Sequence, residues 1–236
     1  MKWIFTILSV LVLAVQTDAG AADRPLTVVE LYTSQGCSSC PPADALAGEL
    51  TKHADVLPLS LHVDYWDYIG WKDPFARAEH TERQRAYSRR FNLRYVYTPQ
   101  MVINGAFQSS GAKRSDVYSF IEQAKAEPHV AMKLIRSGGH LQVALPDGAV
   151  NGEVEVISIF ADRRHDTKIK EGENGGRTLS YYNVVRDMRS IGIWHGKAAK
   201  IAVTMSEISG DLCAVILQET KTRRIIGAVQ IALDGS

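Results

Sequence analysis

The chain has 236 residues, of which 45% are hydrophobic and 22% charged, so its composition excludes a disordered or collagen-like protein. Its 27 basic and 26 acidic residues give a net charge of +1, and we therefore expect no nucleic-acid partner. The length allows one large domain or two domains of about 100 residues each.

The N-terminus has the pattern of a secretory signal. Lys2 precedes an apolar run from Trp3 to Val15, and small residues follow at positions 19–22. The run is too short to span a bilayer, and the small residues are typical of a signal-peptidase site. We predict that residues 1–22 are cleaved and that the mature protein is periplasmic or secreted, with no membrane contact. An uncleaved anchor is the alternative.

The next part of the chain alternates between strand and helix patterns. Apolar, β-branched runs indicate strands, whereas Pro41 and Ser115 are placed to begin helices. The expected order is a strand at 26–33, a helix from 41, a strand at 56–63, a helix at 75–91, strands at 100–103 and 106–109, and a helix at 115–126. This order predicts an α/β domain over residues 23–128.

The pattern changes after Pro128, which ends the last helix. Apolar and polar residues then alternate in short segments at 130–136, 140–145, 153–160, 200–205, 212–217 and 225–231. Such spacing is typical of a β-sandwich or a similar β module. We predict a mostly β domain over residues 129–236, with a flexible loop at residues 172–176.

Three cysteines are present, namely Cys37, Cys40 and Cys213. Cys37 and Cys40 are the natural pair, but a disulfide between them would close a very small loop and add little chain-entropy stabilisation. Such a pair is better suited to a redox switch than to a structural link. Cys213 lies in an apolar run and is expected to be a buried, unreactive thiol.

The chemistry expected at the pair is thiol–disulfide exchange, in which Cys37 attacks and Cys40 resolves the mixed disulfide. Two alternatives are an inert structural disulfide and one half of a zinc site. A zinc site needs further ligands, and the sequence has neither a second cysteine pair nor a His-x₃-His pattern. We therefore predict no metal ligands and no cofactor.

Two segments resemble the glutaredoxin active site. Residues 32–40 (YTSQGCSSC) are similar to its active-site strand and loop, and residues 98–105 (TPQMVING) are similar to its cis-proline segment. The resemblance implies that the bond before Pro99 is cis and that Pro99 faces the dithiol. It also implies that the backbone of Thr98 pairs with a substrate in the manner of a β-strand.

A wider resemblance covers nearly the whole mature chain. Together with residues 98–105, the segments VVELYTSQGCSSCPPAD (28–44), HVDYWDYIGWKDPFA (62–76) and NVVRDMRSIGIW (183–194) resemble the uncharacterised secreted family called domain of unknown function 1223. This resemblance implies a thioredoxin-like fold for the N-terminal domain and an extracytoplasmic location. It names no substrate.

The chain also departs from glutaredoxin. The spacing from Cys37 to Pro99 is longer, residues 63–94 are largely inserted, and no glutathione-binding pattern is present. Pro41 and Pro42 follow Cys40 directly, so the helix is expected to begin after Cys40 and to leave Cys37 outside it.

Three further residues are candidates for the site. Glu30 lies on an expected central strand and is a possible proton acceptor for Cys40, although a surface-facing or salt-bridged Glu30 is the alternative. Trp66 and Trp71 are candidates for a substrate groove beside the dithiol, or else for a cap on the core.

These features predict a secreted thiol–disulfide oxidoreductase that acts on proteins or small thiols. One alternative is a dithiol-based carrier of a metal or another ligand. The other is a non-catalytic interaction protein whose disulfide is structural.

Overall fold

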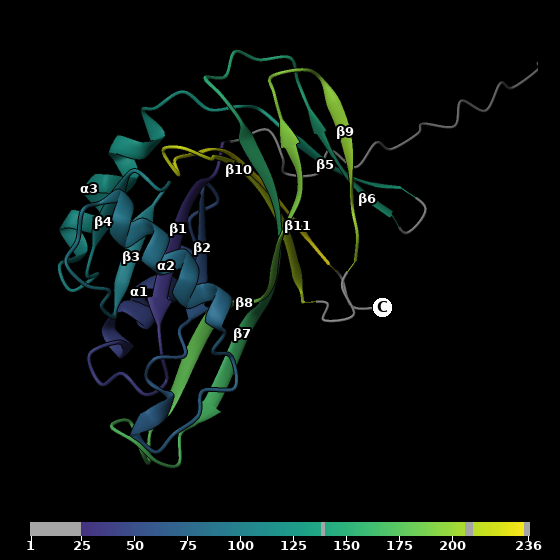
Figure 1. Cartoon of the computed structure of the whole chain (residues 1–236). Helices are drawn as coiled ribbons and strands as arrows, with labels where there is room; N and C mark the ends of the chain where they lie inside the picture. Colours follow the sequence, from purple (N-terminus) through teal and green to yellow (C-terminus); the bar gives the residue numbers. More distant parts are fainter. Residues whose placement is uncertain (1–24, 138–139, 206–209, 234–236) are drawn as a thin grey trace, which may run out of the picture.

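The computed structural model describes residues 25–137, 140–205 and 210–233. The predicted signal peptide lies outside these residues. The described part of the chain contains eleven β-strands, three α-helices and one short 3-10 helix. Eight of the strands form one sheet and the other three form a second sheet (Figure 1).

The eight-stranded sheet has the spatial order β11-β10-β7-β8-β2-β1-β3-β4. Its members are β1 (Thr27–Thr33), β2 (Val56–His62), β3 (Gln100–Ile103), β4 (Phe107–Ser109), β7 (Val154–Lys168), β8 (Thr178–Trp194), β10 (Leu212–Glu219) and β11 (Ile225–Ala232). The second sheet has the order β5-β6-β9. Its members are β5 (Lys133–Ser137), β6 (His140–Leu145) and β9 (Ala199–Val203).

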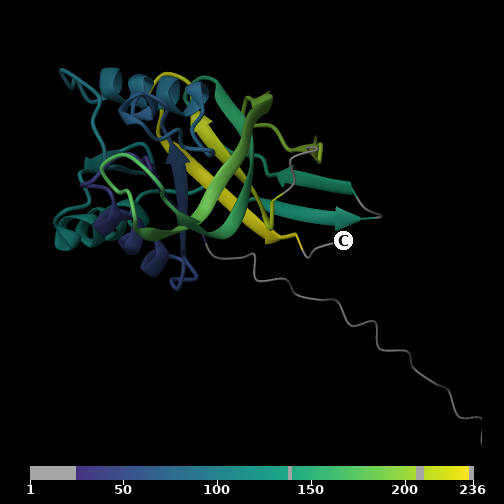
Figure 2. The same ribbon diagram turned by 90° about the horizontal axis from the view of Figure 1, so that it is seen from below.

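Helices cover both faces of the sheet around β1 (Figure 2). They are α1 (Pro41–Leu50), the 3-10 helix η1 (Asp67–Ile69), α2 (Ala78–Arg90) and α3 (Arg114–Lys125). Val29 and Leu31 pack with α1 and α3, whereas Val28 and Tyr32 pack in the core that contains Tyr87 of α2. Since neighbouring side chains of a strand point to opposite faces, β1 is buried on both.

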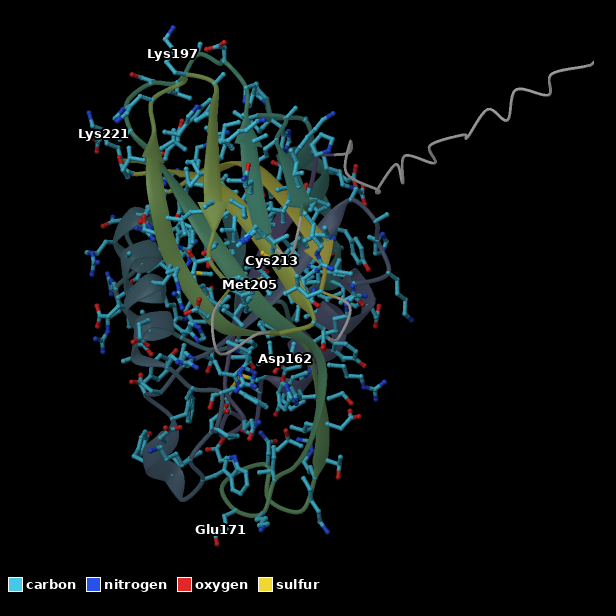
Figure 3. All side chains as sticks on the ribbon, turned by 90° about the vertical axis from the view of Figure 1, so that its right-hand side faces the viewer. Asp162, Glu171, Lys197, Met205, Cys213 and Lys221 are labelled. Atoms are coloured by element: carbon cyan, nitrogen blue, oxygen red, sulfur yellow. A yellow bond between two sulfur atoms is a disulfide. The ribbon has the colours of Figure 1, made fainter. Side chains whose placement is uncertain are left out.

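A long hairpin of β7 and β8 connects the two halves of the chain. β8 pairs with β7 in antiparallel fashion and with β2 in parallel fashion, through Ser60 and Val184. Figure 3 shows how far the hairpin extends, because Glu171 in its tip lies at one end of the molecule and Lys197, beyond the end of β8, lies at the other.

A second core lies between the two sheets. Phe160 and Trp194 of the large sheet pack in one apolar cluster with Leu141 and Val143 of β6. Cys213 of β10 belongs to the same cluster and is fully buried. The side chains of β6 alternate between buried and exposed, as expected for a strand with one covered face, whereas β10 is buried on both faces.

The predicted fold class, an α/β thioredoxin-like N-terminal domain followed by a mostly β domain, is wrong. The chain is mostly β, and its large sheet runs from β4 to β11 without a break. The physical reason is β8, which pairs with β2 on one side and β7 on the other. The order of strands and helices up to α3 is as expected, but these strands make up only part of a larger sheet.

Among the described residues, no helix is both long enough and apolar enough to cross a membrane.

Candidate functional site

A disulfide joins Cys37 and Cys40 in the loop between β1 and α1. Both cysteines are 0% exposed, whereas Ser38 and Ser39 between them are exposed. The loop is built from successive turns, in which Cys37 N–H donates to Ser34 O at 3.1 Å and Cys40 N–H donates to Cys37 O at 3.2 Å. We call residues 34–40 the dithiol loop.

The helix after the dithiol loop begins at Pro41, and Cys40 is its N-cap residue. Proline suits the first helical position because its missing N–H has no partner there. The expectation that the helix starts after Cys40 is therefore confirmed. Cys37 lies outside the helix, one turn before it.

Residues 98 and 99 lie beside the dithiol loop. The antiparallel pairing of β1 with β3 places Tyr32 opposite Gln100 and so brings the two segments together. Ser39 Oγ donates to Thr98 O at 3.5 Å, and the Thr98–Pro99 peptide bond is cis, as the glutaredoxin resemblance implies. The two motifs, which are about 60 residues apart in sequence, form one site.

Trp66 and Trp71 are half-buried and anchored beside the same loop. Trp66 Nε1 donates to Thr98 Oγ1 at 2.7 Å, and Trp71 Nε1 donates to Gln35 Oε1 at 2.8 Å. Each indole therefore contacts one of the two segments that meet at the disulfide. This placement is compatible with walls of a substrate groove and also with a cap on the core.

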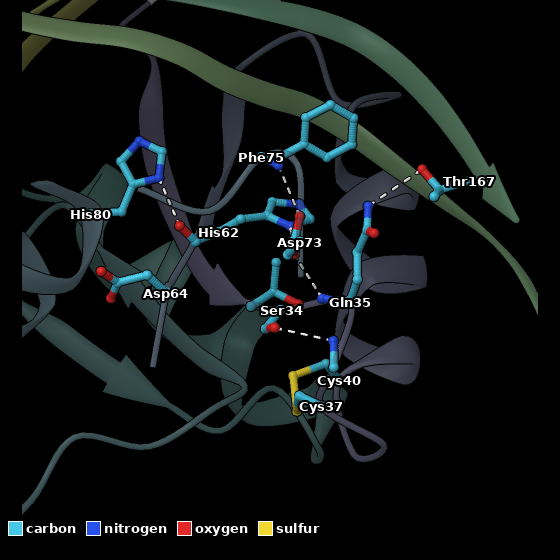
Figure 4. Close-up of polar contacts among 12 residues, drawn as sticks. Ser34, Gln35, Cys37, Cys40, His62, Asp64, Asp73, Phe75, His80 and Thr167 are labelled. Carbon is cyan, nitrogen blue, oxygen red and sulfur yellow. Dashed lines mark hydrogen bonds and ion pairs between the residues drawn. A yellow bond between two sulfur atoms is a disulfide. The ribbon is translucent and has the colours of Figure 1, made fainter. Parts of the chain in front are cut away.

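A buried carboxylate supports the start of the dithiol loop (Figure 4). Asp73 Oδ2 accepts hydrogen bonds from Gln35 N at 2.8 Å and from His62 Nδ1 at 2.6 Å, and Oδ1 accepts from Phe75 N at 2.9 Å. Burial by itself would raise the pKa of Asp73, but the His62 imidazole and these donors outweigh it and lower the pKa. Asp73 thus holds the loop as a charged acceptor.

A second buried carboxyl, that of Asp44, lies in the first turn of α1. Asp44 is four residues after Cys40, so the two residues share one side of the helix. Thr33 Oγ1 donates to Asp44 Oδ1 at 2.8 Å, and Oδ2 has no partner among the described residues. Burial raises the pKa of Asp44 to about 7, although the Thr33 hydrogen bond opposes the shift.

Glu30 is also buried, but on the other face of β1. Its Oε1 accepts from Arg83 Nε at 2.5 Å, and its Oε2 accepts from the Tyr87 hydroxyl at 2.6 Å. Both partners come from α2, whereas the dithiol loop leads into α1. The structure therefore shows the salt-bridged alternative for Glu30 and places no contact between Glu30 and the cysteines.

The tip of the β7–β8 hairpin hydrogen-bonds to the backbone of the dithiol loop. Asn174 Nδ2 donates to the carbonyl oxygens of Gln35 and Cys37, each at 2.9 Å. Glu173 Oε2 accepts from Ser38 N at 3.1 Å. These contacts bring residues about 135 positions away in the sequence onto the backbone of the dithiol loop.

Sequence reasoning missed Asp44, Glu173 and Asn174. A signal for Asp44 was present, because a carboxylate one helical turn after a cysteine must lie near it. No local signal identified Glu173 or Asn174, which lie in a glycine-rich segment predicted only as a flexible loop. Within residues 25–137, 140–205 and 210–233, no three His, Cys, Asp or Glu side chains are grouped so that they could hold a metal ion.

Comparison with known proteins gives a family and two structural relatives. The family described as protein of unknown function DUF1223 matches residues 28–218. The X-ray structure of a protein from Agrobacterium tumefaciens is 31% identical, with a TM-score of 0.79, and the match covers 91% of this chain and 98% of that chain. HBP35 of Porphyromonas gingivalis is 14% identical, with a TM-score of 0.56 and coverage of 91% and 77% respectively.

The likeness to HBP35 shows a shared fold alone, and no curated protein matches the chain. The family match spans the dithiol loop, the Thr98–Pro99 segment and the β7–β8 hairpin. This protein is therefore a member of the DUF1223 family of proteins of unknown function.

Proposed function

We propose that the protein is a thiol–disulfide oxidoreductase, which exchanges the Cys37–Cys40 disulfide with thiols of proteins or small molecules. The observation that carries the proposal is the meeting of two motifs, because Ser39 of the dithiol loop contacts Thr98 of the cis-proline segment at 3.5 Å. A disulfide between residues three positions apart adds little chain-entropy stabilisation. A role in exchange accounts for its presence better than a role as a structural link.

The exchange proceeds in two balanced steps. A thiolate of the substrate attacks Cys37 Sγ, the Cys37–Cys40 bond breaks, and its electron pair leaves on the Cys40 sulfur. A second substrate thiolate then attacks the substrate sulfur of the mixed disulfide and releases Cys37 as a thiolate. Two substrate thiols are thereby oxidised to a disulfide, and the protein disulfide is reduced to a dithiol. The reverse sequence oxidises the protein.

We propose that Asp44 exchanges a proton with Cys40. Its carboxyl lies one helical turn from Cys40, and its pKa of about 7 leaves it partly protonated at neutral pH. It can therefore give a proton to the departing Cys40 thiolate and take it back when the disulfide re-forms. General acids work best when their pKa lies near the operating pH.

The substrate is proposed to bind along the Thr98 backbone. The two tryptophans flank this segment and the dithiol loop, and Tyr68 and Tyr95 nearby in the chain are 82% and 72% exposed. An extended peptide beside residue 98 would gain main-chain hydrogen bonds and aromatic contacts together. This arrangement supports a protein or peptide thiol as the preferred substrate.

An extracytoplasmic location is part of the proposal. It is supported by the apolar run that follows Lys2 and by the disulfide itself, since disulfides persist in oxidising compartments.

One observation favours a second candidate, a structural disulfide in an interaction protein. Both cysteines are 0% exposed. A substrate thiolate therefore reaches Cys37 only when the dithiol loop, or the residues that pack over it, move. A buried disulfide that resists reduction would have a potential below about −300 mV, whereas known dithiol oxidoreductases lie between about −270 and −120 mV.

The reduction potential separates the two candidates. The mature protein is equilibrated with dithiothreitol and glutathione at graded ratios, and the free thiols are counted after alkylation and mass measurement. A Cys213→Ala background leaves only the pair to be counted. A potential in the oxidoreductase range supports exchange, and one below about −300 mV supports the structural candidate.

A trapping experiment then assigns the roles of the cysteines. With glutathione disulfide as the probe, Cys40→Ser is expected to form a stable mixed disulfide through Cys37. Cys37→Ser is the matched variant and is expected to form much less. Equal labelling of the two variants would contradict the assignment of Cys37 as the attacking residue.

A further inference from the structure

The tip of the β7–β8 hairpin is a compact turn rather than an open loop. Gly176 N–H donates to Ile169 O at 2.9 Å, and Gly175 N–H donates to Gly172 O at 3.0 Å. Gly172 and Gly176 have φ angles of +76° and +82°, which glycine adopts without strain. A Cβ atom on Gly172 would lie 3.2 Å from Cβ of Trp71, so the tip also packs against Trp71.

Asn174 is the anchor of this turn. Its side-chain amide donates to two carbonyl oxygens of the dithiol loop, and its Oδ1 accepts from Arg177 Nη1 at 2.8 Å. Asn174 is 0% exposed. An amide that is buried with its donors and acceptor in use is held firmly, because a displaced amide would leave buried polar groups without partners.

Glu173 brings a negative charge close to the dithiol loop. Hydrogen bonds with the Ser38 side chain and N–H hold the pKa of Glu173 below its ordinary value, so the carboxylate is charged at neutral pH. Ser38 N is bonded to the carbonyl carbon of Cys37, so Glu173 Oε2, 3.1 Å from that nitrogen, lies within about 8 Å of Cys37 Sγ. This distance is shorter than the Debye length of about 10 Å at 0.1 M salt.

Two other charged side chains, Arg177 and Asp73, lie near the turn, and their charges are the same in the wild type and in a Glu173 variant. Arg177 directs its guanidinium to Asn174 Oδ1, and the Asp73 carboxylate accepts from Gln35 and His62. In the described part of the chain, Glu173 is the acidic side chain that hydrogen-bonds to the residues between the two cysteines.

We propose that Asn174 and Glu173 are positioning residues of the dithiol site. Asn174 fixes the hairpin tip against the dithiol loop, and the Glu173 carboxylate held there disfavours the negatively charged thiolate of Cys37. Since the oxidised pair carries no charge, the like charge penalises only the reduced form and shifts the equilibrium toward the disulfide. This inference rests on the proposed function and concerns how strongly the site favours its oxidised state.

The test is Glu173→Gln, which keeps an oxygen that can accept from Ser38 N–H and removes the charge. Glu171→Gln is the matched control, because it removes the same charge from the same turn and Glu171 is exposed, with no hydrogen bond to the dithiol loop among those observed. Each mature protein is equilibrated with reduced and oxidised dithiothreitol at pH 8. In this reaction dithiothreitol gives two electrons and two protons to the disulfide and becomes the cyclic disulfide.

We expect the equilibrium constant for reduction to rise by about threefold in Glu173→Gln, and the pH midpoint of Cys37 alkylation by iodoacetamide to fall by about half a unit. The difference should shrink at 1 M salt, where the Debye length is about 3 Å. A purely structural role would not produce this salt dependence. Asn174→Ala should shift the equilibrium in the same direction, and adding Glu173→Gln to it should have little further effect.

The outcomes distinguish this inference from the proposed function. If the wild type and both Glu variants exchange with the same equilibrium constant, the inference is overturned and the proposed function stands. An equal shift in Glu171→Gln would also overturn it, because net charge rather than position would be responsible. If dithiothreitol reduces none of the folded proteins, the proposed function itself fails.

Discussion

Thr33 Oγ1 donates a 2.8 Å hydrogen bond to Asp44 Oδ1, which links the end of β1 to the first turn of α1. The dithiol loop lies between these two residues in the chain, so the bond closes the base of the loop. Both residues are buried, at 0% and 3% exposure, and burial raises the pKa of Asp44 to about 7. The carboxyl at the base of the dithiol loop is therefore a titrating group in a buried position.

This raised pKa predicts a pH-dependent effect of Asp44→Asn on stability. Between the unfolded-state pKa of about 4 and the folded-state pKa of about 7, folding takes up a proton, so the stability of the wild type falls as pH rises through this range. Asparagine does not titrate. The free energy of unfolding of the variant, relative to wild type, should therefore rise by up to about 1.4 kcal/mol per pH unit between those values and level off above them.

Urea unfolding at a series of pH values measures this difference. The control is Asp116→Asn, at a partly exposed position where the carboxylate pairs with Lys113, and it should follow the wild-type profile. Parallel profiles for Asp44→Asn and wild type would show that Asp44 titrates as an ordinary carboxyl.

The Glu30–Arg83 ion pair is predicted to matter for stability and not for exchange. The pair is buried, with side-chain exposures of 0% and 9%, so Glu30→Ala leaves an uncompensated charge and should cost about 3–5 kcal/mol. The exposed Glu82–Arg85 pair on the same helix is the control, and Glu82→Ala should cost less than about 1 kcal/mol. Guanidinium unfolding checks both values. A changed dithiothreitol equilibrium in folded Glu30→Ala would contradict the placement of Glu30 away from the cysteines.

Reduction of the disulfide is predicted to destabilise the fold only modestly. The chain-entropy relation gives about 2 kcal/mol for a loop as short as that between Cys37 and Cys40. Urea unfolding of the oxidised protein and of the Cys37→Ser/Cys40→Ser double variant measures the loss. A loss several times larger, or failure of the double variant to fold, would favour the structural disulfide over the exchange function.

Cys213 is predicted to be unreactive in the folded protein. It lies on β10 of the large sheet, between β7 and the edge strand β11, and burial raises the pKa of its thiol to about 12 (Figure 3). The native oxidised protein should therefore show almost no reaction with Ellman's reagent over minutes, whereas the urea-unfolded protein should show one thiol. Rapid reaction of the native protein would mean that β10 opens readily or that a cysteine of the pair is free.

The dithiol loop could be located from the sequence because its signals are local. An apolar run predicts β1, Pro41 predicts the start of α1, and the two cysteines between them then lie in a strand-to-helix loop. Short-range rules of this kind depend on backbone geometry and burial, which neighbouring residues report directly. The strand at 100–103 was predicted in the same way.

β8 was not found, because its pattern is mixed. Arg186, Asp187 and Arg189 interrupt the apolar residues, so the alternation pattern predicted no strand between residues 160 and 200. The strand is held by its neighbours, as Arg186 Nη1 binds Asp162 of β7 at 2.7 Å and Ser60 of β2 pairs with Val184. Hydrophobic periodicity does not report such pairings. The error in fold class follows from this one strand.

The chemistry of the pair follows from residue types and spacing, since two cysteines separated by two residues at the start of a helix can form a disulfide in any fold that keeps the loop. The surroundings of the pair depend on contacts between distant segments. Glu173 and Asn174 reach the loop only because β7 and β8 extend together past β2, and Glu30 is kept from it because neighbouring residues of β1 face opposite sides of the sheet. Sheet register and the length of a hairpin are set by non-local pairing, which no short stretch of sequence encodes.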